Sequence, residues 1–511
     1  SDSIESAKTY IANKGTSDFN KIAPTINYVV TETEGTNDDG VISTYHHFTL
    51  GKGYTFDNET GMFFLTDYIN DALNDNYLGY YTCGETSGTR NSCIELYKIK
   101  AYTKSGTKYQ VTNAIVYSYK TKTSLSSEGG LYKTDDYDGN PTYYFRGDVS
   151  NNYIYYAGYY FRIVRINSDG SIRIIYDGTT PHKNGEASSD RQIGTTQYNS
   201  NYWDLTYAGY MYSEDFELKE NDTTTVTYFN FSENTTYYYG SSYTFDTSTK
   251  KFKLSGNTTS GVWSNVYSNV ITNYPYTCFS TSVSGTCNYI LKLTGYVSGY
   301  QAKVNYISYS SKDYASILNN TTDSTIKTYI DNWYQNNILN KTDENNISYS
   351  EYLTDNVFCD DRSLSSGDGF SLSKVTEYNP FKRLITTQDP SLLCSQASDK
   401  FTTSSTLGNG KLTYPVGLIN IDEVYLAGGK YLNNNNKYYL YTGTTYWTLS
   451  PGVFYPSQGF AYTWRVLLSG YPDTAWVTGS HGVRPVLNLS SNILISSGSG
   501  TYNNPYQIKL S

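Results

Sequence analysis

The stretch YWTLSPGVFYPSQGFAYTWRVLLSGYPDTAWVTGSHGVRPVLNL, residues 446–489, decides the fold of the chain. It begins with an apolar and small-residue run at 447–451 and ends with GVRPVLNL at 482–489, which predicts a turn followed by a buried strand. Between these ends, polar and aromatic residues are punctuated by glycine and proline. Because recognition residues concentrate in loops held by a rigid scaffold, the pattern predicts a binding surface on a frame.

The composition indicates a β-rich α+β chain. The 511 residues include 59 Tyr against 19 Phe and 2 Met, with abundant Asn, Ser, Thr and Gly, which favour strands and turns. The net charge of -9 offers no basic field for a phosphate backbone, so nucleic acid is excluded as an expected partner. The start at Ser1 has no signal-peptide pattern, so we expect a processed or truncated region that meets a membrane only through an anchor absent from this chain.

Six cysteines fall into local pairs rather than the CxxC spacings of metal sites. We predict three disulfides and hence an oxidising, extracellular setting; the alternative is six free thiols in a cytosolic protein. The predicted bonds are Cys83–Cys93, Cys278–Cys287 and Cys359–Cys394.

An internal repeat defines the domains. Residues 54–65 and 243–254 share seven of twelve positions, and each copy is followed by Tyr-Thr-Cys and a second cysteine. We therefore predict two small disulfide-pinned β-modules, the second inserted into a larger domain. The expected division is a helix (3–13) and linker over 1–50, the first module over 51–125, a linker over 121–142, the inserted module over 215–305, and the larger domain over 140–214 plus 306–511.

Two elements within the larger domain are clear from sequence. Residues 161–176 predict a hairpin around Asp169-Gly170, and apolar residues at three- and four-residue steps predict a helix over 324–339, capped by Asp323 or Ser324. We expect structural pairing of a group of arginines with nearby Asp or Glu; these are Arg146, Arg162, Arg165 and Arg173. Asp135, Asp136, Asp138 and Asn140 faintly match a calcium loop, but no Glu closes it, so a solvated turn is favoured.

A series of motifs resembles a known group of proteins. They lie at residues 143–147, 157–171, 330–334, 357–362, 412–419, 446–451 and 482–489. In this order they are similar to Tyr/Asn-rich surface proteins of low-GC gut bacteria, whose C-terminal half resembles the C-type-lectin-like fold of formylglycine-generating enzymes and of the variable proteins of diversity-generating retroelements. The resemblance covers about 140–214 and 306–511. It implies that 483–489 is scaffold and that variable loops within 450–481 form the ligand face.

Two departures limit what the resemblance implies. No cysteine lies beyond Cys394, whereas formylglycine-generating chemistry needs reactive cysteines near the C-terminal site. Calcium-dependent sugar-binding lectins carry Glu-Pro-Asn or Gln-Pro-Asp, and here only Tyr471-Pro472-Asp473 is found. We expect no metal and no cofactor.

The sequence favours binding over catalysis. It has no GxSxG, HExxH, P-loop or CxxC motif and only four histidines; Asp360 and Asp361 could serve a glycosidase but are adjacent beside a predicted disulfide. Aromatic contact faces and directional polar groups predict the ligand site. For Trp464 and Trp476 the alternative is a position in the core, and Trp447 is assigned to the core. The predicted ligand-binding residues are Tyr455, Tyr462, Trp464, Arg465, Tyr471, Asp473, Trp476 and His481.

These observations predict a surface-displayed ligand-binding protein, an adhesin or receptor and not an enzyme. Its expected partner is a protein or glycan on another cell or on a phage. One alternative is a structural subunit of an extracellular filament or surface layer, in which edge strands of the modules pair between chains. Another is a carbohydrate-active or formylglycine-generating-like enzyme.

Overall fold

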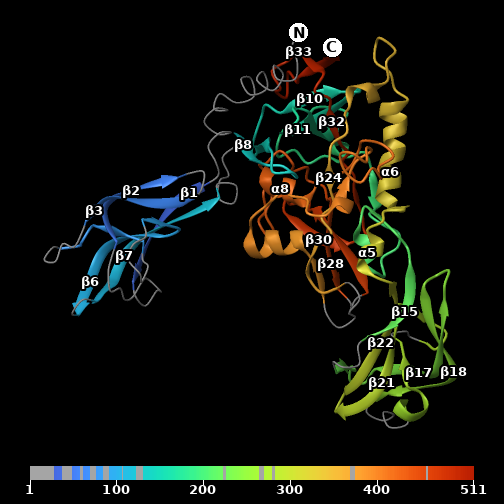
Figure 1. Ribbon diagram of the computed structural model, residues 1–511. Coiled ribbons are helices and arrows are strands. Elements are labelled where there is room, and N and C mark those ends of the chain that lie inside the picture. The colour runs from blue at the N-terminus through green and yellow to red at the C-terminus, as the bar shows by residue number, and fades with distance from the viewer. Residues whose placement is uncertain are drawn as a thin grey trace.

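The computed structural model describes residues 28–36, 49–57, 61–69, 76–83, 91–105, 108–121, 130–221, 226–263, 270–278, 282–368, 375–455 and 459–511. The helix predicted at 3–13 lies outside these ranges. The described residues form an N-terminal β-module, a central domain and a second β-module inserted into that domain (Figure 1). Strands predominate, so the prediction of a β-rich chain is confirmed.

The N-terminal module is one antiparallel sheet in the order β1-β7-β6-β4-β2-β3-β5. The Cys83–Cys93 disulfide connects residues at its β4 and β5 ends. The predicted boundary at residue 51 is wrong, because β1 pairs along its whole length with β7. The strands are β1 (Tyr28–Thr36), β2 (Leu50–Asp57), β3 (Met62–Ile69), β4 (Tyr81–Thr82), β5 (Ser92–Cys93), β6 (Leu96–Ser105) and β7 (Lys108–Thr121).

The inserted module repeats this topology, with the order β15-β22-β21-β19-β17-β18-β20 and β16 added beside β22. Phe252 pairs with Cys287 as Phe63 pairs with Cys93, and Cys278–Cys287 is bonded. The repeat seen in the sequence is therefore also a repeat of structure. The strands are β15 (Phe216–Glu220), β16 (Thr227–Asn230), β17 (Thr236–Asp246), β18 (Lys251–Val262), β19 (Tyr276–Thr277), β20 (Thr286–Cys287), β21 (Tyr289–Ser298) and β22 (Gln301–Ser311), so the module ends beyond the predicted residue 305.

The central domain contains two main sheets. The first has the order β32-β12-β11-β9-β8, with β10 beside β11. The predicted linker over 121–142 is partly wrong, because β8 begins this sheet at Gly130 and buries Leu131 and Tyr132. Its strands are β8 (Gly130–Asp135), β9 (Pro141–Arg146), β10 (Tyr153–Tyr156), β11 (Tyr159–Ile166), β12 (Ile172–Gly178) and β32 (Val486–Leu489).

The hairpin β11–β12 confirms the turn predicted at Asp169-Gly170, where Gly170 has a φ of 88°. The loop before β9 is also a turn, because Asp136 Oδ1 accepts the backbone N–H groups of Asp138 and Asn140.

The second sheet carries the end of the chain that was predicted to hold the ligand. Its path is β13-β31-β28-β26-β25, and β29 and β30 extend it from the other side of β28. The strands are β13 (Thr195–Gln197), β25 (Leu364–Ser366), β26 (Thr376–Tyr378), β28 (Tyr446–Tyr455), β29 (Phe460–Val466), β30 (Pro472–Trp476) and β31 (Ser480–Gly482). Much of 450–481 is therefore strand, and the expectation that it consists of loops is wrong.

Two helices pack against these sheets. Helix α6 (Thr325–Tyr334) begins where predicted, because the Ser324 hydroxyl accepts the Lys327 N–H, and it continues into a π-helical turn at Gln335–Leu339. Helix α8 (Ile421–Ala427) starts with a capping box between Asn420 and Glu423 and ends at Gly428, whose φ is 127°.

The arginine pairing predicted from sequence ties the hairpin to α8. Arg165 Nε and Arg173 Nη1 donate to Glu423 Oε2 at 2.9 and 3.2 Å, all three side chains being buried. Arg146 Nη1 donates to the carbonyls of Tyr425 and Leu426 near the C-terminus of α8, where a cation is favoured. Because an unpaired buried charge is expensive, this network fixes α8 against the first sheet.

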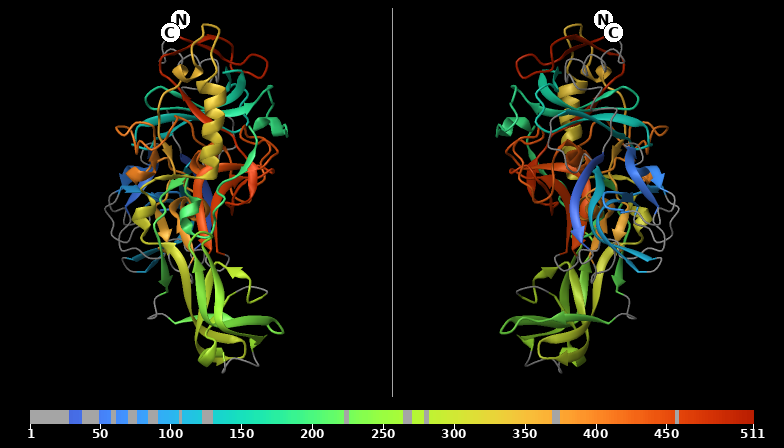
Figure 2. Two further views of the ribbon diagram at one scale, coloured as in Figure 1. Left: turned by 90° about the vertical axis from the view of Figure 1, so that its right-hand side faces the viewer. Right: turned by 90° about the vertical axis from the view of Figure 1, so that its left-hand side faces the viewer.

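The inserted module projects from the end of the central domain that carries β28 and β30 (Figures 1 and 2). Aromatic side chains cross the junction: Trp203 packs on Phe216 at 4.9 Å between ring centroids, Phe216 on Tyr309 at 5.5 Å, and Tyr309 on Phe245 at 4.4 Å. These contacts join the core of the domain to the module's strands, so the two bodies share a packed boundary.

Candidate functional site

The candidate site lies on strands β28 to β30, whose register sorts side chains onto two faces. Tyr462 of β29 pairs with Trp476 of β30, and Tyr455 of β28 pairs with Phe460 of β29. Arg465, an odd number of residues from Tyr462, pairs with Trp447 and Asp473. Since neighbouring side chains in a strand point to opposite sides, the predicted residues do not form one surface.

The first side carries an aromatic cluster at the ends of the strands, which we call the aromatic face. It consists of Tyr202, Tyr455, Phe460, Tyr462 and Trp476. The Trp476 ring stacks on Phe460 at 4.9 Å, and Phe460 stacks on Tyr202 at 4.6 Å. Tyr455 contacts Tyr462 edge-on at 4.9 Å.

Trp476 is the exposed member of this face. It is 51% exposed, whereas Tyr462 is only 8% exposed. Its indole N–H donates a hydrogen bond to the Tyr462 hydroxyl. An aromatic ring that is half open to solvent and held by stacking and a hydrogen bond is a preorganised contact surface.

The inserted module borders the aromatic face. Lys251 Nζ lies 4.8 Å from the centroid of the Tyr202 ring and donates to the Tyr202 hydroxyl at 2.7 Å. The same ammonium donates to Asn288 Oδ1 of the module. A row of π systems thus runs from Trp476 through Phe460 and Tyr202 to a cation.

The opposite side of the sheet carries a polar cluster made of Arg465, Asp473 and His481. Arg465 Nε donates to Asp473 Oδ1 at 2.8 Å, and Arg465 Nη1 donates to His481 Nε2 at 2.9 Å. The His481 ring packs edge-on against Trp447 at 4.8 Å. Because Arg465 and Asp473 are only 22% and 23% exposed and already paired, this cluster mainly orders the sheet.

His481 is neutral in this setting. Burial, and then the charge of Arg465, lowers the pKa of His481 to about 4. Because guanidinium only donates, Nε2 is the acceptor and the ring proton sits on Nδ1. The ring is thus a hydrogen-bond acceptor toward Arg465.

Trp464 does not belong to the site. Its side chain is 0% exposed and packs within the central core against Phe381, with 5.9 Å between ring centroids. The prediction that it contacts ligand is wrong, because it lies deeper along the face whose outer end carries Trp476. Trp447 is in the core as expected. Tyr471 is half-buried in the turn closed by the Leu467 N–H to Tyr471 O bond, apart from the aromatic face.

Three contributors to the aromatic face escaped sequence reasoning. Phe460 could have been found from the alternation Phe460-x-Tyr462-x-Trp464, which places all three rings on one side of a strand. Tyr202 and Lys251 gave no usable signal, since they are distant in sequence from β29 and reach it only through the fold.

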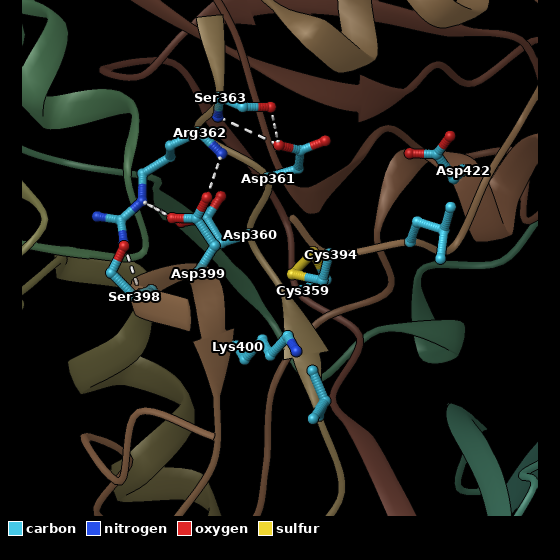
Figure 3. Close-up of a disulfide and its surroundings, with 12 residues drawn as sticks. Cys359, Asp360, Asp361, Arg362, Ser363, Cys394, Ser398, Asp399, Lys400 and Asp422 are labelled. Carbon is cyan, nitrogen blue, oxygen red and sulfur yellow. Dashed lines mark hydrogen bonds and ion pairs between the residues drawn. A yellow bond between two sulfur atoms is a disulfide. The ribbon is translucent and has the colours of Figure 1, made fainter. Parts of the chain in front are cut away.

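A second cluster of ionisable groups surrounds the Cys359–Cys394 disulfide (Figure 3). Four buried aspartates share two arginines; the members are Asp360, Asp361, Asp399 and Asp422 with Arg362 and Arg383. Arg362 Nε donates to Asp399 Oδ1 at 2.8 Å and lies 3.9 Å from Asp360 Oδ2. Burial raises the pKa of Asp360 to about 7 and that of Asp399 to about 6, with Arg362 opposing the rise.

This cluster has the character of a structural network. Its carboxylates are buried and most of their oxygens are paired with arginine, hydroxyl or backbone N–H groups, although Asp360 Oδ1 has no partner among the described residues. A glycosidase pair, by contrast, has to face the sugar from both sides. The third disulfide anchors the cluster, and all three predicted disulfides are confirmed.

Across the described ranges, no group of three or more His, Cys, Asp or Glu is arranged to hold a metal ion. Nor does any helix within them have the length and apolarity needed to cross a bilayer. Three disulfides indicate a protein that folds outside the reducing cytoplasm. No protein-family model, no curated protein and no solved structure shows significant similarity to the chain.

Proposed function

We propose that the chain is an extracellular, surface-displayed ligand-binding protein of the adhesin or receptor type, without catalytic activity. In this proposal the central domain is C-type-lectin-like, and the aromatic face binds a protein or glycan on another cell or on a phage. The observation that carries the proposal is Trp476, half exposed on a row of stacked rings. Exposed, rigidly held Trp and Tyr are the side chains that most often dominate binding energy.

The position of the site supports the same proposal. The aromatic face is built on paired strands, and Trp447, Leu449 and Trp464 of the same strands are fully buried in the core. A ligand would therefore meet a surface that needs little ordering on binding, which lowers the entropic cost of association.

The test compares Trp476→Ala with a matched control, Tyr228→Ala. Tyr228 is 49% exposed on β16 of the inserted module, so both variants remove a half-exposed aromatic ring. The fluorescently labelled chain is applied to a glycan array and to intact bacterial cells. We expect Trp476→Ala to weaken the wild-type binding by about 2 kcal/mol, or about thirtyfold in Kd, and Tyr228→Ala to leave it unchanged. Equal binding by wild type and Trp476→Ala would refute this assignment.

A structural subunit is the second candidate, favoured by the position of β1 at the edge of its sheet. Such an edge is a template for pairing with another chain. The exposed Glu32 and Glu34 oppose this pairing because they place charge along the strand. Sedimentation velocity over a hundredfold concentration range distinguishes the two: assembly that Glu32→Thr strengthens supports the subunit, and a constant monomer supports a binding protein.

A further inference from the structure

We propose that a cleft at the end of the central domain opposite the aromatic face is a second, separate ligand site and that it binds a neutral saccharide unit. The cleft has a volume of about 330 Å³. Strand β10, the segment 343–352 and the C-terminal strand β34 (Gln507–Leu510) surround it. In Figure 1, β10 and the C-terminus lie at one end of the central domain, and β28 and β30 lie toward the other end. The volume falls within the range of small-molecule sites in proteins.

The walls of the cleft are held in place by the fold. The Tyr156 hydroxyl donates to Tyr349 O at 2.5 Å, and the Tyr352 hydroxyl donates to Asp343 Oδ2 at 2.6 Å. Asp343 Oδ1 also accepts the N–H groups of Asn345 and Ile347 at 2.8 and 3.0 Å. On the far side, the Tyr155 N–H donates to Tyr506 O and so joins β10 to the chain that leads into β34. The cleft is therefore preformed rather than an opening between loose loops.

The lining offers both hydrogen-bonding directions beside aromatic rings. The polar residues that line the cleft include Tyr155, Glu344, Tyr349, Gln507 and Lys509. Within the described part of the chain, neither the Tyr155 nor the Tyr349 hydroxyl has a hydrogen-bond partner. Tyr349 is supported edge-on by Tyr156 at 5.6 Å, which leaves its hydroxyl as a directed donor or acceptor.

This chemistry selects among ligand classes. An apolar ligand would leave carboxylate and amide groups without water or partners, which is unfavourable. An anionic ligand would meet Asp343 and Glu344 with Lys509 as the one cation in the lining. A neutral sugar presents several hydroxyls, each both donor and acceptor, together with an apolar ring face that can lie against tyrosine.

The experiment uses the full chain and four probes: the methyl glycosides of glucose, galactose, N-acetylglucosamine and glucuronic acid. Saturation-transfer NMR is expected to show at least one neutral glycoside bound with a Kd on the order of 1 mM, and the glucuronide bound about tenfold more weakly or not at all. The site variants are Tyr349→Phe and the double substitution Glu344→Gln with Gln507→Ala. The control is Glu351→Gln, an exposed carboxylate on the same segment that does not line the cleft.

We expect the double substitution to weaken the neutral glycoside about tenfold or more, through lost hydrogen bonds, and the control to bind as wild type. Thermal unfolding verifies that each variant is folded. Absence of transfer to all three neutral glycosides, preference for the glucuronide, or unchanged binding by the double variant would overturn the proposal. Binding that Trp476→Ala abolishes and the double variant leaves intact would place the sugar on the aromatic face, and would likewise overturn it.

Discussion

Replacing Trp464 with alanine should unfold the central domain far more readily than replacing Trp476. The Trp464 ring is fully buried, and burying a Trp side chain removes roughly 150–250 Å² from water, or about 4–6 kcal/mol at about 25 cal/mol per Å². Measured Trp-to-Ala losses in cores are about 3–5 kcal/mol because neighbours relax into part of the space. We therefore expect Trp464→Ala to lower the free energy of unfolding by about 4 kcal/mol.

Trp476→Ala loses much less because half of its surface is already in water. It forfeits the stack on Phe460 and the bond to Tyr462, together about 1–2 kcal/mol. Differential scanning calorimetry of both variants measures the contrast. At about 2–4 °C per kcal/mol for a domain of this size, the central transition should fall by about 8–16 °C for Trp464→Ala and by about 2–8 °C for Trp476→Ala.

Trp464→Phe is the conservative control. The Trp464 indole N–H is buried with no hydrogen-bond partner among the described residues, so phenylalanine removes an unsatisfied donor while it keeps most of the apolar area. We expect it to lose less than half of what alanine loses. A Trp464→Ala transition within about 2 °C of wild type would refute the core assignment and return this ring to the ligand site.

Removal of the Cys359–Cys394 disulfide, by replacing both cysteines with serine, should destabilise the central domain by about 4 kcal/mol, since the bond closes a separation of 35 residues. Calorimetry of this variant beside the wild-type protein, without reductant, measures the loss. Burial raises the pKa of Asp360 to about 7, so the folded state holds an extra proton between about pH 4 and pH 7 and the contribution of this group falls as pH rises through that window. Asp360→Asn should therefore raise Tm more at pH 8 than at pH 5, and an equal effect at both values would contradict the assignment. The His481 ring, whose pKa is lowered first by burial, should titrate near pH 4 by NMR, so its contribution to stability is lost as pH falls from about 6.5 toward 4. Arg465→Gln should raise this pKa but leave it below about 6.5, and an unchanged value would show that the Arg465 charge plays no part.

Local sequence signals predicted local structure well. Gly170 can adopt the positive φ that a tight hairpin needs, so the β11–β12 hairpin follows from Asp169-Gly170 and its flanking strands. Ser324 caps α6 by a bond three residues away. The disulfides at Cys83 and Cys278 join residues close in sequence, and each follows from spacing.

Long-range pairing was the part that sequence could not predict. Strand β1 owes its place to β7, where Thr31 faces Ser118, and β32 owes its place to β12, where Leu489 faces Ile172. At the candidate site, the sequence indicated which residue types take part, but not on which side of the sheet each side chain lies. The division of Tyr462 from Arg465 depends on β29 being a strand, and the membership of Tyr202 depends on a contact with Phe460 that no local pattern encodes.

The attachment of the two modules has a mechanical consequence. In each, the first and last strands are antiparallel neighbours, with Tyr28 opposite Thr121 in one and Phe216 opposite Ser311 in the other. Tension applied to both ends of such a pair peels it open one residue pair at a time instead of shearing all pairs together. Along a chain under load the N-terminal module lies in series and would extend in this way. In the inserted module the chain leaves the central domain and returns to it. The same load is therefore carried by the central domain and not by the module, so the module's contacts with the aromatic face stay intact.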